Sequence, residues 1–271
     1  MQLRALPLSL TLILSASGQT PTPDATAQQA LITRMREAAI TYADRLQDFL
    51  CTQFTTRSVD ASGSGKHWKI LETQELDLGY IAHEEHARLL KVNGKTTDLE
   101  KRVKKGYFRP GGEFGSSLLR IFDPKAAAEF QWDHQESIAG ARACVFRYRV
   151  PVETSTLVMT ADLDHVKMAH HGFVTADCDT GAITRIQIET EPASVVRRGH
   201  DVAIGVQLDV SYGPTVIGSK EFLLPQHALE IVPFGQTRTK AEIRYENYRK
   251  YDSDSNITFD DGPIKPPDLI K

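Results

Sequence analysis

Residues 141–150 read Ala-Arg-Ala-Cys-Val-Phe-Arg-Tyr-Arg-Val, and they set the pattern for the second half of the chain. Every second residue from position 144 is apolar: Cys144, Phe146, Tyr148 and Val150. Arg147 and Arg149 lie between them. Because successive side chains of a strand point to opposite faces, this alternation predicts a strand with one buried and one wet face.

The same period of two recurs on both sides of this stretch. It predicts further strands at 68–80, 81–92, 183–189, 202–210 and 240–246. Asn93-Gly94 after the second of these is a hairpin turn signal. No strand–helix–strand alternation occurs, so we expect an antiparallel sheet and not a parallel doubly wound one.

Helices are expected at the N-terminus and near the middle. Apolar residues at three- and four-residue spacing predict a helix over 27–50, with Asp24 or Thr26 as its N-cap. Shorter helices are expected at 118–122, capped by Ser116 or Ser117, and at 124–130. The fold class is therefore α+β: a curved, half-open antiparallel β-barrel packed on an N-terminal helix and short inserted helices.

Composition narrows the class of protein. The chain has 271 residues, of which 41% are hydrophobic and 25% are charged, which is globular composition. It excludes a fully disordered chain, a collagen-like repeat and a polytopic membrane protein. With 32 basic and 35 acidic residues the net charge is −3, which does not support a nucleic-acid partner.

The first 18 residues have the anatomy of a cleavable secretory signal. Arg4 precedes an apolar run from Ala5 to Leu14, and the small residues Ala16 to Gly18 follow. We therefore expect a signal peptide at 1–18, a linker at 19–26, a single domain at 27–252 and a flexible tail at 253–271. The expected location is periplasmic or secreted.

The three cysteines are Cys51, Cys144 and Cys178. An oxidising compartment permits one disulfide and leaves one thiol over. Three pairings are open at this stage. Cys144, which alternates with large apolar residues, is expected to be buried in the core.

The motifs that resemble catalytic or metal sites each break at a required position. Asp179-Thr180-Gly181 spells the aspartic-protease loop but follows Asp177-Cys178 and is expected to be a hairpin turn. His83 and His86 are three apart, which is not the zinc-protease spacing. The stretch 252–263 starts like a calcium loop but has Ile257 and Pro263 where Gly and Glu are needed.

His165, His170 and His171 have no identifiable fourth ligand and are expected to be surface histidines in a hinge. We therefore expect no catalytic residue, no metal and no cofactor.

A basic stretch precedes the glycine-rich segment 111–115. Its cations are Lys101, Arg102, Lys104, Lys105 and Arg109. A solvated charge run is the plain interpretation, and contact with an anionic membrane surface or an acidic partner is the alternative.

The sequence resembles a group of uncharacterised secreted bacterial proteins. The resemblance rests on the helix end at 46–53, on 112–116 with 121–124, on 172–185, and on the last strand at 245–251. The predicted shape of that group is similar to the periplasmic lipoprotein carriers LolA and LolB and the sensor RseB. The resemblance implies an unclosed antiparallel barrel plugged by helices, and a lipid or lipoprotein as partner.

These observations lead to one expected function and two alternatives. The expected function is non-enzymatic binding of a lipid or acyl chain in the concavity of the open barrel. Its expected contacts are Trp132, Phe146, Tyr148, Ile186, Ile188, Val206 and Leu208. The alternatives are a protein-interaction or sensor module with a filled core, and a hydrolase.

Overall fold

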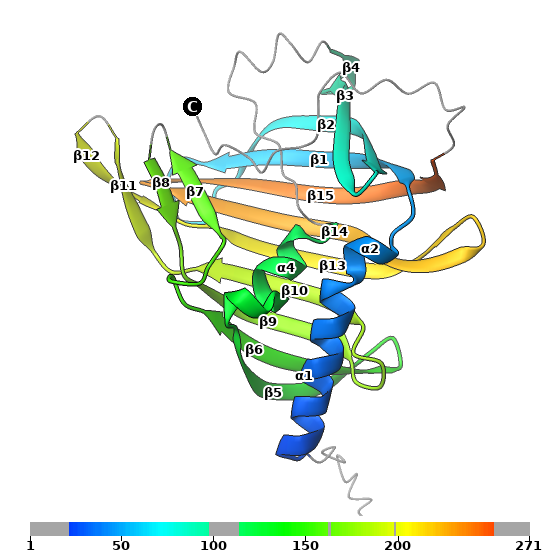
Figure 1. Ribbon diagram of the computed structural model, residues 1–271. Coiled ribbons are helices and arrows are strands. Elements are labelled where there is room, and N and C mark those ends of the chain that lie inside the picture. Colours follow the sequence, from blue (N-terminus) through cyan, green and yellow to red (C-terminus); the bar gives the residue numbers. More distant parts are fainter. Residues whose placement is uncertain (1–21, 98–113, 162–163, 198, 252–271) are drawn as a thin grey trace, which may run out of the picture.

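The computed structural model describes residues 22–97, 114–161, 164–197 and 199–251, and most of them lie in one large antiparallel sheet (Figure 1). The strands are β1 (Phe49–Asp60), β2 (Lys69–Ile81), β3 (Glu84–Val92), β4 (Lys95–Thr96), β5 (Glu129–Ile138), β6 (Ala141–Val150), β7 (Val158–Ala161), β8 (Asp164–Lys167), β9 (His170–Asp177), β10 (Ile183–Thr190), β11 (Ala193–Arg197), β12 (His200–Ile204), β13 (Gln207–Ile217), β14 (Lys220–Phe234) and β15 (Thr237–Lys250). The helices are α1 (Ala25–Ile40), α2 (Tyr42–Arg45), α4 (Ser116–Phe122) and the 3₁₀ turn η1 (Pro124–Ala126).

The sheet is open and antiparallel. Its strands follow the order β4-β3-β2-β1-β15-β14-β13-β10-β9-β6-β5, so β1 pairs with the last strand, β15, while β5 and β4 lie at opposite ends of the order. The β11–β12 hairpin branches off β14, and β7 and β8 form a separate two-stranded ribbon. The expected α+β fold with an unclosed, curved sheet is confirmed.

The helices lie on one face of this sheet (Figure 1). The α1 helix begins at Ala25 because the Asp24 carboxylate accepts the Ala27 N–H at 2.8 Å, as expected for one of the two candidate caps. It buries one apolar stripe consisting of Leu31, Ile32, Met35 and Ala39. This face of the sheet is therefore the core face, and the opposite face is the outer face.

The expected helix over 27–50 was too long at its C-terminus. Regular helix ends at Ile40, a short α2 follows, and Phe49 already belongs to β1. The apolar spacing of Leu46 and Phe49 is compatible with a helix or a strand. Phe49 forms a strand because it pairs with Tyr80 on β2 and Lys250 on β15.

Three further expectations need correction. The strand expected at 202–210 is two strands, because the chain breaks at Gly205 and Val206 between β12 and β13. The helix expected at 124–130 is only the η1 turn, since Asp123 caps a single turn and β5 begins at Glu129. The N-cap of α4 is Gly115, and neither expected serine forms a cap hydrogen bond.

Candidate functional site

Six of the seven expected ligand contacts lie in two adjacent rows across the core face of the sheet. Trp132 pairs with Phe146 in a row that continues through Val174 to Ile186. Tyr148, Ile188 and Leu208 belong to the next row. The seventh, Val206, lies just before β13, where its N–H donates to the Thr190 hydroxyl.

Gly172 of β9 allows the Tyr148 side chain of β6 to reach across β9 to β10. A Cβ at position 172 would lie 1.9 Å from the carbonyl oxygen of Gln187, so only glycine fits between the strands there. The Tyr148 hydroxyl passes over it and donates to that same carbonyl at 3.2 Å. The sequence pattern placed Tyr148 on this face, and Gly172 explains how it packs.

The helices and neighbouring side chains fill most of this core face. Phe146, Tyr148, Ile186 and Ile188 are buried, whereas Trp132 and Leu208 keep partial exposure and pack against the core. On the side of η1, Phe122 of α4 stacks on Phe130, which in turn contacts Tyr148. In this structure the two rows are therefore core, beneath a helical cover.

A hollow of about 230 Å³ remains at the edge of the covered face. It lies among α1 and α2, the α4 helix, the start of β10 and the β13–β14 hairpin. Its lining is mostly apolar, and consists of Ala38, Ala39, Tyr42, Arg45, Leu46, Leu118, Ala182, Ile183, Glu221, Phe222 and Leu223. None of the seven expected contacts is among these residues.

Side-chain hydrogen bonds tie the wall of this hollow together. The Tyr42 hydroxyl donates to the carbonyl oxygen of Leu223 at 2.9 Å, and the Gln47 amide donates to that of Ile217 at 3.0 Å. Both bonds join the segment after α1 to the β13–β14 hairpin. The segment is thus fastened to the hairpin by polar contacts beside an apolar space.

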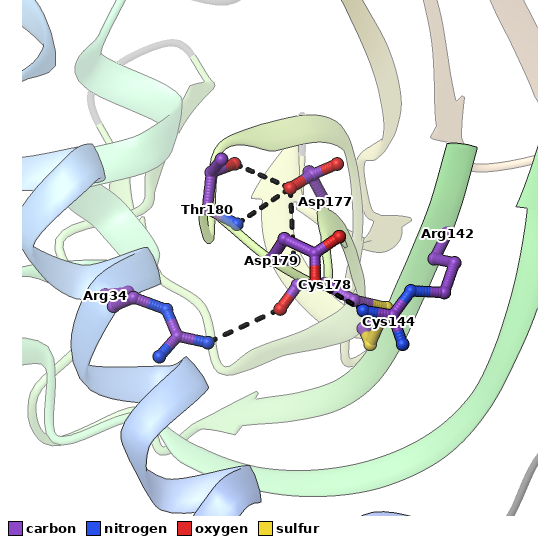
Figure 2. Close-up of a disulfide and its surroundings, with 7 residues drawn as sticks. All are labelled: Arg34, Arg142, Cys144, Asp177, Cys178, Asp179 and Thr180. Atoms are coloured by element: carbon purple, nitrogen blue, oxygen red, sulfur yellow. Dashed lines mark hydrogen bonds and ion pairs between the residues drawn. A yellow bond between two sulfur atoms is a disulfide. The ribbon is translucent and has the colours of Figure 1, made fainter.

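The middle of α1 is anchored on a disulfide-bonded turn (Figure 2). Cys144 of β6 is bonded to Cys178, and Arg34 of α1 donates to the Cys178 carbonyl oxygen at 3.4 Å. Gly181 approaches so closely that a Cβ would lie 2.7 Å from the Arg34 Cβ. Cys51 is the cysteine left free, and it is buried.

The turn itself is held by Asp177. Its carboxylate accepts hydrogen bonds from the Thr180 hydroxyl and from the backbone N–H groups of Thr180 and Asp179, and these bonds hold its pKa below the usual range. Asp179 forms an ion pair with Arg142, also drawn in Figure 2. The aspartic-protease-like stretch is therefore a hairpin turn, as expected.

A charged group lies in the same row as Tyr148 and Ile188. Glu230 is aligned with Leu208, and burial raises its pKa to about 7, although Arg120 of α4 and Arg57 of β1 lower it. Arg57 is itself bonded to Glu72 at 3.0 Å. The apolar face thus ends in a polar region beside α4.

His170 corrects the expectation of three surface histidines. It is completely buried, with its Nδ1 3.5 Å from the Tyr148 hydroxyl. Burial, followed by the charges of Arg120 and His171, lowers the pKa of His170 to about 4, so its imidazole is neutral at physiological pH. The other two, His165 and His171, are exposed as expected, and both lie on strands, β8 and β9.

The outer face carries a second, larger groove of about 900 Å³. It crosses the sheet from Phe54 on β1 to Ile138 at the end of β5. Most of its charged side chains form ion pairs or hydrogen bonds. Arg185 donates two hydrogen bonds to Asp209, and Arg142 pairs with Asp179. An apolar ligand here would have to displace water from ion pairs, which is costly.

Three residues in this outer groove are of catalytic types. Ser211 and His227 are cross-strand partners, and Asp209 is on the same strand face as Ser211. The Ser211 hydroxyl, however, donates to the His227 carbonyl oxygen, and the Asp209 carboxylate is held by Arg185 and Gln187. No nucleophile–base hydrogen bond of the kind used in acyl transfer is formed among these three.

The remaining sequence motifs lie in turns, on strands or outside the described residues. His83 lies in the β2–β3 turn at a positive φ of 65°, while His86 is on β3. Within the described ranges, no group of three or more His, Cys, Asp or Glu side chains is arranged to hold a metal ion. The basic stretch from Lys101 to Arg109 and the calcium-loop-like segment after Asp252 lie outside the described residues.

Sequence reasoning missed the residues that line the hollow. They come from segments far apart in the chain, as Leu118 and Phe222 illustrate, so no local period marks them. The apolar spacing predicted that the N-terminal helix buries one face, which agrees with the burial of Leu31 and Met35, but it did not show that space remains beside that face. In the part of the chain that the structure describes, no helix is long and apolar enough to cross a membrane.

No family model and no curated protein matches the sequence. Among solved structures, the chain is similar to an outer membrane lipoprotein-sorting protein domain from Vibrio parahaemolyticus, with 14% identity and a TM-score of 0.38 over 86% of this chain and 95% of that one. A LolA superfamily protein from Nitrosomonas europaea has 8% identity and a TM-score of 0.33, covering 83% and 93% of the two chains. A DUF1329 family protein from Desulfovibrio piger has 11% identity and a TM-score of 0.36, covering 88% and 96%.

Those likenesses are too distant to say what the chain does. The arrangement seen in Figure 1, an unclosed antiparallel sheet with an N-terminal helix and short helices on one face, is nevertheless the one that the resemblance to LolA, LolB and RseB implied.

Proposed function

We propose that this protein is an exported, non-enzymatic binding protein for a hydrophobic ligand, a lipid or an acyl chain. The ligand enters the hollow between α1, α4 and the β13–β14 hairpin. The observation that carries this proposal is an apolar space whose wall is fastened to the hairpin by side-chain hydrogen bonds beside an otherwise filled core.

The chemistry of the lining favours this hollow over the outer groove. Contact with Leu118, Phe222 and Leu223 removes apolar surface from water on both sides, at roughly 25 cal/mol per Å². The outer groove offers more room but presents paired charges such as Arg185 and Asp209. Apolar ligand sites are lined mainly by hydrophobic side chains with few polar groups, which describes the smaller space.

The hollow has to grow to hold a long chain. Its 230 Å³ is below the roughly 300–1,000 Å³ of typical small-molecule sites. We propose that it extends, when α4 shifts, toward the covered rows at Ile186 and Phe146. In this proposal the seven residues expected from the sequence form the deeper part of the site: Trp132, Phe146, Tyr148, Ile186, Ile188, Val206 and Leu208.

Export is supported by the disulfide. The bond between Cys144 and Cys178 is typical of an oxidising compartment, which agrees with the signal-like residues 1–18. We therefore propose a periplasmic or secreted location. N-terminal sequencing of protein recovered outside the cytosol should start close to Gln19, and intact Met1 in the exported fraction would contradict cleavage.

The test of binding is a titration with N-phenylnaphthylamine, a neutral apolar dye that fluoresces in dry environments. Ala38 lines the hollow and Ala30 is an exposed residue of the same helix. We expect the wild type and Ala30→Trp to take up the dye, and Ala38→Trp to lose most uptake because the indole fills the space. Equal uptake by folded Ala38→Trp would overturn this site.

The alternative of a protein-interaction or sensor module with a filled core is favoured by the burial of Phe146 and Ile186. It predicts no dye uptake by the wild type. Mass spectrometry of gently extracted native protein would separate the two readings, since a carrier should bring a lipid with it.

A further inference from the structure

Two charged residues from different elements line the apolar hollow. Arg45 is the last residue of α2, and Glu221 is near the start of β14, beside the hairpin. Both are exposed, and the other lining residues are apolar apart from the Tyr42 hydroxyl. The hollow therefore has an apolar interior and one cation and one anion at its surface.

These two charges differ from those on the outer face in their ion pairing within the described part of the chain. Among the described residues, neither Arg45 nor Glu221 forms an ion pair, with each other or with a third group. On the outer face, by contrast, Arg149 pairs with Glu191 and Lys240 pairs with Glu242. With respect to the described residues, both charges can contact a ligand that enters the hollow.

We propose, resting on the proposed function, that the hollow takes a single-chain amphiphile with a zwitterionic head group that carries a phosphate and a primary ammonium. The acyl chain lies against Leu118 and Phe222. The phosphate contacts the Arg45 guanidinium, whose planar donors suit phosphate oxygens, and the ammonium contacts the Glu221 carboxylate.

Size and charge together select this class. A hollow of about 230 Å³ suits one narrow chain better than two. A purely anionic head group would satisfy Arg45 but would place a second negative charge beside Glu221. A head group with both charges satisfies the two residues at once.

The experiment measures displacement of N-phenylnaphthylamine by three probes that share one palmitoyl chain: lysophosphatidylethanolamine, lysophosphatidylglycerol and palmitate. We expect the ethanolamine lipid to displace the dye at about tenfold lower concentration than the glycerol lipid, because only its ammonium can form a charge-assisted hydrogen bond with Glu221. Glu221→Gln should remove that preference, and Arg45→Gln should weaken both phospholipids. Glu242→Gln, on the outer face, is the matched control and should change neither.

The outcomes separate this inference from the proposed function. Dye uptake with no preference between the two phospholipids, or a preference that survives Glu221→Gln, would overturn the head-group proposal and leave apolar binding in place. Absence of dye uptake by the wild type would overturn both.

Discussion

The hydroxyl of Tyr42 donates to the carbonyl oxygen of Leu223 at 2.9 Å, and so joins α2 to the β13–β14 hairpin directly beside the apolar hollow. Burial raises the pKa of this hydroxyl well above its usual value, so it stays a donor throughout the physiological range. The bond holds the wall of the hollow in place without filling the hollow.

Tyr42→Phe should therefore loosen this wall while keeping the ring. The ring still packs edge-on against Tyr212, so we expect a loss of only about 1 kcal/mol in the free energy of unfolding. The rate of dye entry, followed by stopped-flow fluorescence, should rise. An unchanged or slower entry rate would show that the bond does not control access.

The contact between Gly181 and α1 gives a second prediction with an internal control. Gly181 and Gly218 both have positive φ angles, 76° and 64°, so alanine costs backbone strain at either position. Only at Gly181 would the new Cβ press on α1, 2.7 Å from the Arg34 Cβ, whereas nothing lies within 4 Å at Gly218. Hydrogen exchange of α1 should accelerate in Gly181→Ala and not in Gly218→Ala; equal exchange would contradict the anchoring role of the turn.

Reduction of the disulfide should destabilise the same turn. The bond closes a loop with a sequence separation of 34 residues, for which about 3 kcal/mol of stabilisation is typical. Thiol titration in denaturant should find one free thiol, that of Cys51, before reduction and three afterwards. Chemical unfolding with and without reductant measures the loss, and an unchanged midpoint would contradict it.

Glu230 gives a prediction for pH. Its carboxyl has a raised pKa of about 7, so the folded state holds a proton that the unfolded chain loses near pH 4.5. The contribution of this group to stability is therefore highest at low pH and falls as pH rises from about 4.5 to 7. Arg120 and Arg57 moderate the effect, and Glu72 already engages Arg57.

The comparison with Glu230→Gln isolates this group, because the other titrations, including that of His170, cancel in the difference. Between pH 4.5 and pH 8, the free energy of unfolding of the variant should rise relative to that of the wild type by on the order of 2 kcal/mol. This figure is reduced for the partial exposure of the residue. Urea unfolding at several pH values measures this difference. If the free energies of unfolding of the two proteins differ by the same amount at every pH, Glu230 ionises normally.

Much of the fold could be predicted because burial on one face dictates a period of two. The strands around Phe146, Ile186 and Ile243 follow that period, and the structure places all three in the core. The pattern could not locate the end of the N-terminal helix, because Leu46 and Phe49 satisfy both periods. It also could not show the break at Gly205, whose N–H donates to the Pro233 carbonyl oxygen on another strand.

The sequence predicted the apolar character of the candidate site but not its location. The sequence indicates that an apolar face exists and which side chains it carries, and Tyr148 and Ile188 are indeed on it. How far helices cover that face depends on contacts between distant segments, such as Tyr42 with Leu223. The hollow is what those contacts leave open, and no local pattern encodes it.

The central claim, that an apolar chain binds between α1, α4 and the hairpin, is tested most directly by photo-crosslinking. A palmitate analogue with a diazirine at the end of its chain is added to the folded protein, irradiated and mapped by peptide mass spectrometry. We predict crosslinks to residues of the hollow and its extension, at Leu118, Phe222 or Ile186. Crosslinks confined to Phe54 and Leu229 in the outer groove, or none above the level of the Ala38→Trp variant, would contradict the claim.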